Sequence, residues 1–180
     1  MQRIVLRFGL ASGGILVAMT AVMMPLCMRG VIDFSHSEII GYSAMVLSFL
    51  LVFAGIKSYR DTVAAGAISF GRAFGIGLLI TLITCAMYVI AWEIVYFNFF
   101  PDFLDQYTAH VLAKMHASGA SEAAIRETTA KMADMAKLYP NPLYNSAITF
   151  MEVFPVGLIV TLVSAAILRR KPRRDAPAAA

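Results

Sequence analysis

Charged residues are scarce in this sequence. Asp, Glu, Lys and Arg make up 14% of the 180 residues, whereas hydrophobic residues make up 59% and the mean hydropathy is +0.73. A soluble domain holds about 25% charged and about 45–50% apolar residues. A chain of this length cannot bury the excess apolar surface in one core. The composition therefore favours a protein that is solvated by lipid.

Motifs for catalysis and for cofactor binding are also absent. The sequence contains no GxSxG, no Walker motif, no HExxH and no glycine-rich dinucleotide loop with its flanking strand. No two of the histidines His36, His110 and His116 are spaced by four, the spacing that places two zinc ligands on one helix face. We therefore predict a protein that is not an enzyme, with no cofactor and no metal site.

Cysteine is limited to Cys27 and Cys85. They fall near one end of the first apolar run and near the middle of the third, and this difference in depth argues against a disulfide. The net charge of +4 does not indicate nucleic-acid binding, because the basic residues cluster beside apolar runs instead of forming a stripe interleaved with aromatic residues.

Four long apolar runs dominate the chain, and they cover residues 8–28, 39–56, 73–97 and 147–168. Each is expected to cross the bilayer as a helix, because lipid offers no partner to open backbone groups. The first run is longer than the apolar part of a signal peptide, which has about 7–15 residues, so we interpret it as an uncleaved span. The sequence thus predicts an all-α integral membrane protein, with four transmembrane helices in an up-down bundle that forms one domain over residues 1–171.

The basic residues that flank these runs predict the orientation. One side carries Arg3, Arg7, Lys57, Arg60, Arg72, Arg169, Arg170, Lys171, Arg173 and Arg174, and the other carries Arg29, Lys114, Arg126, Lys131 and Lys137. On the second side only Arg29 lies in a short loop. Because Lys and Arg in short flanking segments favour the cytoplasm, we expect both chain ends there.

The polar segment between the third and fourth runs contains two apolar stripes at helical spacing. Gly119 fits the end of one helix and Ser121 the N-cap of the next, while Pro140 and Pro142 are expected to end the second helix. This pattern predicts an extracytoplasmic helical hairpin over residues 101–139, which folds on itself or lies on the outer leaflet. Residues 172–180 are rich in Pro, Ala and Arg and are expected to form a disordered cytoplasmic tail that touches anionic lipid.

The chain resembles the domain-of-unknown-function 4199 family of bacterial membrane proteins. The resemblance is carried by GIKSYRD (55–61), GAISFGRAF (66–74), YVIAWEIVYFNFFPDFLDQY (88–107) and TFMEVFPVGLIVTLVSAAILRRK (149–171). It implies a four-span protein of the bacterial inner membrane. It transfers no catalytic residue, because the family has no assigned activity.

Glu93 and Glu152 lie inside apolar runs, each a few residues from the predicted outer end. Carboxylates in spans usually face the bundle interior or a wet cavity. We hypothesise a carboxylate-lined vestibule that opens to the outside, with Arg29 as the counter-charge. The alternative is structural, in which each Glu reaches interfacial water or bonds a neighbouring hydroxyl group.

Three further groups carry weaker signals. Pro155 and Gly157 predict a kink in the fourth span, which is a feature of transporter sites but also of ordinary spans. A stripe of sulfur ligands would suit Cu(I), although methionine is more often an apolar filler. A cytoplasmic loop could bind lipid phosphate, or its charges could be simple topology signals. The stripe is Met19, Met23 and Cys27, and the loop residues are Lys57, Arg60, Asp61 and Arg72.

The preferred function is a non-enzymatic inner-membrane assembly or interaction protein. Its expected partners are membrane lipids and either a second copy of the chain or another membrane protein, with no nucleic acid. The alternative is a small transporter, or a protein coupled to protons or cations, that uses Glu93 and Glu152.

Overall fold

The computed structural model describes residues 1–170, apart from the side chains of Phe34 and Ser35. Within this range the chain forms six helices, and its only strand-like pairing is one isolated bridge. The helices are α1 (Gln2–Met28), α2 (Phe34–Thr62), α3 (Phe70–Phe99), α4 (Phe103–Ala117), α5 (Glu122–Leu138) and α6 (Pro142–Leu168). The predicted tail over residues 172–180 lies outside the described residues.

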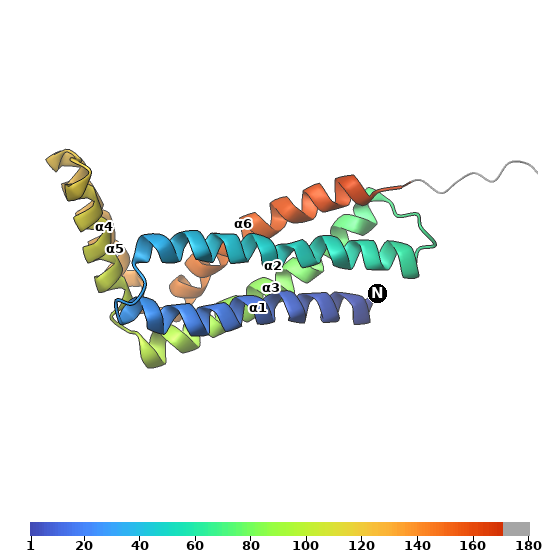
Figure 1. Cartoon of the computed structure of the whole chain (residues 1–180), viewed down its shortest axis with the longest axis horizontal. Helices are drawn as coiled ribbons and strands as arrows, with labels where there is room; N and C mark the ends of the chain where they lie inside the picture. The colour runs from blue at the N-terminus through green and yellow to red at the C-terminus, as the bar shows by residue number, and fades with distance from the viewer. Residues whose placement is uncertain (171–180) are drawn as a thin grey trace, which may run out of the picture.

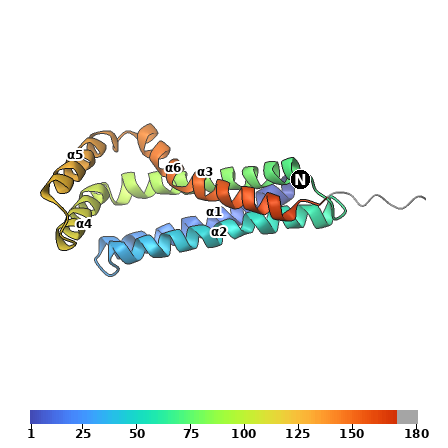
Figure 2. The same ribbon diagram turned by 90° about the horizontal axis from the view of Figure 1, so that it is seen from above.

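Four long helices, α1, α2, α3 and α6, lie side by side as one bundle (Figures 1 and 2). Each of them is long and apolar enough to cross a membrane. The all-α class and the four candidate spans are therefore confirmed.

Two bundle helices, α3 and α6, begin before their apolar runs because polar residues cap them. Ser69 Oγ accepts a hydrogen bond from the backbone N–H of Arg72 at 3.4 Å, so α3 begins at Phe70 instead of residue 73. Asn141 Oδ1 accepts one from the N–H of Leu143 at 3.0 Å. The expectation that Pro142 ends a helix is therefore wrong. It is the first residue of α6, where proline's missing N–H is harmless.

Glycines allow the bundle helices to approach closely. A Cβ atom added to Gly9 would lie 2.9 Å from the side chain of Ile83, so no side chain fits between α1 and α3 at this position. Gly157 on α6 has a similar role against α3, since its added Cβ would lie 2.5 Å from Thr81 Cγ2. Gly75 has no such neighbour within 4 Å.

Buried hydroxyl pairs join the helices in the middle of the bundle. The Oγ atoms of Ser12 on α1 and Ser48 on α2 are 2.8 Å apart, and Thr81 Oγ1 on α3 lies 2.9 Å from Thr161 Oγ1 on α6. Each of these four hydroxyl groups thus finds a partner within the bundle.

The α4–α5 pair leaves the bundle where α3 ends and α6 begins (Figure 1). The predicted stop and cap between the two helices are confirmed. Gly119 has φ = +71°, and Ser121 Oγ accepts a hydrogen bond from the N–H of Ala124 at 3.2 Å. The pair is fixed to the bundle by Trp92, whose Nε1–H donates to Tyr139 Oη at 3.2 Å. The N-terminus and the last residues of α6 lie together at the opposite end of the bundle (Figures 1 and 2).

Candidate functional site

A cavity of about 500 Å³ lies at the α4–α5 end of the bundle. All six helices contribute to its wall. The contributions are the second half of α1, the first half of α2, the second half of α3, the beginning of α4, the end of α5 with Tyr139, and the first half of α6. No single segment of the chain predicts this cavity, because its wall is assembled from segments far apart in the sequence.

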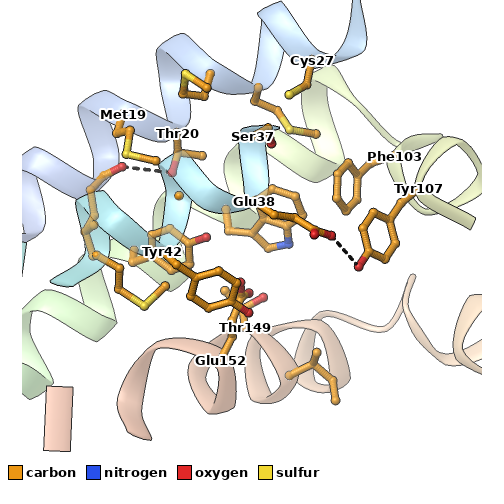
Figure 3. A pocket seen from close by; sticks show the side chains of 18 of the residues that line it. Met19, Thr20, Cys27, Ser37, Glu38, Tyr42, Phe103, Tyr107, Thr149 and Glu152 are labelled. Atoms are coloured by element: carbon orange, nitrogen blue, oxygen red, sulfur yellow. Dashed lines mark hydrogen bonds between the residues drawn. The ribbon is translucent and has the colours of Figure 1, made fainter. Parts of the chain in front are cut away.

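Two carboxylates face the cavity. Glu38 projects from the first turns of α2 and Glu152 from α6 into the same space (Figure 3). Glu38 Oε1 accepts a hydrogen bond from the hydroxyl of Tyr107 on α4 at 3.2 Å. The carboxylate of Glu152 has no hydrogen bond or ion pair with any described residue. Glu152 is exposed at the cavity although it lies well inside a membrane-length helix.

Basic side chains are missing from the described part of the cavity wall, where neither Lys, Arg nor His occurs. The predicted counter-charge, Arg29, is the C-cap of α1 and is exposed outside this wall. The two carboxylates therefore make the cavity electronegative.

Glu93 lies elsewhere. Its Oε1 accepts a hydrogen bond from Ser146 Oγ on α6 at 2.9 Å, and it does not belong to the cavity wall. The cavity wall thus contains Glu152 and not Glu93, and Glu93 bonds a neighbouring hydroxyl group. Glu38, and not Glu93, shares the cavity wall with Glu152. Sequence reasoning missed Glu38 because it directly precedes the second apolar run, where a carboxylate resembles an ordinary flanking charge.

Aromatic side chains form much of the remaining wall. They include Trp92, Phe103, Tyr42, Tyr88, Tyr107 and Tyr139. Burial raises the pKa of Tyr107 to about 12, helped by the negative charge of Glu38 and more weakly by that of Glu152. Burial also raises the pKa of Tyr139 to about 12, although the hydrogen bond from Trp92 acts in the opposite direction. Both phenols therefore stay protonated, and the Tyr107 hydroxyl donates to Glu38.

The predicted sulfur stripe also faces this cavity. Met19, Met23 and Cys27 line it, together with Met24, Met45 and Met135. Among the described residues no group of three or more His, Cys, Asp and Glu side chains could hold a metal ion. The thioethers form a polarisable and deformable apolar wall.

The remaining candidate residues lie away from the cavity wall. Pro155 is inside α6, which changes direction part-way along its length (Figure 2). Gly157 is buried against Thr81 and Phe49.

The candidate loop lies at the opposite end of the bundle, where α2 ends and α3 begins. There Arg60 Nε pairs with Asp61 Oδ1 at 2.7 Å, and the Arg72 guanidinium lies 5.5 Å from the Tyr59 ring centre. Lys57 is exposed.

Comparison with known proteins finds one family. A family model described as a protein of unknown function (DUF4199) matches residues 7–170. The match includes every residue of the cavity wall described above. No curated protein and no solved structure matches the chain.

Proposed function

The chain belongs to the DUF4199 family of proteins of unknown function, and we propose that it is a small, non-enzymatic membrane protein that binds a small molecule in this cavity. The observation that carries the proposal is the carboxylate of Glu152. It faces a cavity of about 500 Å³ from within a membrane-length apolar helix and has no partner among the described residues.

Two physical arguments support this proposal. Placing a carboxylate inside an apolar span is costly, so such residues generally serve a function. The cavity volume also falls in the range of about 300–1,000 Å³ that is typical of small-molecule sites. Glu93 needs no such explanation, because Ser146 already satisfies it.

The proposed orientation places the cavity in the outer half of a bacterial inner membrane. The bundle is up-down, both chain ends are cytoplasmic, and the α4–α5 pair is an extracytoplasmic hairpin. The distribution of basic residues supports this, since Arg3, Arg7, Arg169 and Arg170 belong to one end of the bundle. A reporter that is active only in the cytoplasm should work at either chain end and fail when inserted at Gly119. Activity at Gly119 would contradict this orientation.

Filling the cavity tests the proposed function directly. Gly41 lies in the cavity wall on α2, and an added Cβ would make only an ordinary contact of 3.8 Å with Met19 Cε. Gly41→Leu should therefore occupy cavity space without straining the helix. Gly75→Leu is the matched control, because it makes the same change in another bundle helix where nothing lies within 4 Å.

Trp92 provides the readout, since it is the single tryptophan of the chain and it lines the cavity. Purified protein in lipid nanodiscs is titrated with cationic, neutral and anionic small molecules while Trp92 fluorescence and thermal melting are followed. We expect at least one class to bind wild type and Gly75→Leu, and to lose binding in Gly41→Leu. If no class binds, or if binding survives Gly41→Leu, the proposal is wrong.

A second candidate, a membrane assembly or interaction protein, is favoured by the surface of the α4–α5 pair. None of the residues of α5 is buried, and the apolar side chain of Leu138 is 51% exposed. In this candidate Leu138 supplies the apolar contact with the partner. In this case Leu138→Lys should remove a co-purifying partner in mild detergent, whereas Lys137→Gln should not. Retention of the partner by Leu138→Lys would reject this surface.

A further inference from the structure

We infer that the ligand of the cavity is an organic cation with an apolar body, such as an alkylammonium or arylammonium ion. This inference rests on the proposed small-molecule binding and specifies its chemistry. The juxtaposition that supports it is the pair Glu38 and Glu152 at one cavity whose wall is otherwise aromatic and sulfur-rich.

The charge of the wall selects for a cation. Glu38 has one hydrogen bond, from Tyr107, and Glu152 has none with a described residue. No Lys, Arg or His of the described wall offsets these two carboxylates. A positively charged group beside these carboxylates would interact with them more strongly than water does, whereas an anion would be repelled.

The aromatic faces select for a bulky, weakly hydrated cation. Trp92, Tyr42, Tyr88 and Phe103 line the same space as the carboxylates. Aromatic rings attract cations through their quadrupoles, and this recognition suits ammonium groups that carry carbon substituents. A small metal ion would instead require several oxygen ligands converging on one point. The described residues offer no group of three such side chains.

The size and apolarity of the wall select for a ligand with a carbon body. Leu16, Met45, Leu104 and Ile148 contribute apolar surface to a space of about 500 Å³. Burial of apolar ligand surface against these side chains adds to affinity. A bare inorganic cation would leave most of this volume and surface unused.

Three probes of similar shape and different charge test the inference. Benzyltrimethylammonium is a permanent cation, neopentylbenzene is its neutral isostere, and 3-phenylpropionate is an anion of similar size. Each is titrated against the full chain in zwitterionic nanodiscs, which avoid the attraction of anionic lipid for cations. Trp92 fluorescence and thermal melting report binding. We expect the cation to bind and the neutral and anionic probes to bind at least about tenfold more weakly.

Variants locate the interaction. Glu38→Gln and Glu152→Gln should each weaken cation binding by about 10- to 100-fold, because each removes one of the two negative charges that attract the ammonium group. Glu152→Asp keeps the negative charge and should retain most of the wild-type affinity for the cation. It therefore shows whether the weaker binding of Glu152→Gln comes from the missing charge or from misfolding. Glu93→Gln is the matched control and should bind as wild type does, since Glu93 is outside the cavity wall.

The outcomes separate this inference from the proposed function. Suppose that the neutral or the anionic probe outcompetes the cation and loses its binding in Gly41→Leu. The cavity is then a binding site, as proposed, but the inference that its ligand is an organic cation is wrong. Unchanged cation affinity in both Gln variants would also overturn the inference. If none of the three classes binds wild type, both this inference and the proposed function are wrong.

Discussion

Replacement of Gly157 by alanine is expected to destabilise the bundle through steric overlap. The new Cβ would lie 2.5 Å from Thr81 Cγ2 and 2.7 Å from two ring carbons of Phe49. Neither neighbour can move away easily, because both are completely buried and Thr81 is also hydrogen-bonded to Thr161 at 2.9 Å. α6 would therefore have to shift away from α2 and α3.

The magnitude follows from two opposing terms. Inserting a methyl group into a packed core costs about 1–3 kcal/mol. Alanine in place of glycine stabilises a helix interior by up to about 1 kcal/mol. Gly157→Ala should therefore lower the free energy of unfolding by about 0–2 kcal/mol. Gly75→Ala gains the helical term without the overlap, because nothing lies within 4 Å of its Cβ. The difference between the two variants isolates the packing term at about 1–3 kcal/mol.

Reversible unfolding in mixed micelles, in which a denaturing detergent is titrated against a mild one, measures this difference. Wild type and both variants are compared at the same protein and lipid concentration, since binding equilibria shift apparent stability. If Gly157→Ala and Gly75→Ala have the same stability within about 0.5 kcal/mol, the close approach of α6 to α3 does not exist as described.

Two further predictions concern single polar contacts. Tyr107→Phe removes the only hydrogen bond that a described residue donates to Glu38. Amide hydrogen exchange in α4 should therefore become faster by an amount corresponding to about 1 kcal/mol. Unchanged protection of the α4 amides would contradict this contact. In a double-mutant cycle, Thr81→Val and Thr161→Val should show a coupling of about 0.6 kcal/mol, the average for polar pairs between membrane helices. Strictly additive effects of these two changes on unfolding would indicate that the hydroxyl pair does not contribute.

Local signals were enough to identify the helix boundaries inside the polar segment. Gly119 ends α4 with a positive φ and Ser121 caps α5, as their residue types require. Pro142 was misinterpreted because proline can either follow a helix or open one. The neighbouring Asn141 cap decides between these outcomes.

The membership of the cavity wall could not be predicted in the same way. Glu93 and Glu152 share a similar predicted depth, yet Ser146 satisfies Glu93 while Glu152 faces the cavity. Depth follows from position along an apolar run, but the direction of a side chain depends on how its helix is rotated about its own axis. A span that is apolar on all sides carries little periodic signal for that rotation.

The four candidate spans follow from the amino-acid sequence alone, because they depend on composition and on the lengths of apolar runs, and the family follows from the motifs of the chain. The make-up of the cavity wall does not follow from the sequence, since Glu38 shares the cavity with Glu152 whereas Glu93 and Arg29 do not. The physical reason is that contacts between helices set their rotation. The close approach at Gly157 and the hydroxyl pair of Ser12 and Ser48 are such contacts, and they join residues far apart in the chain.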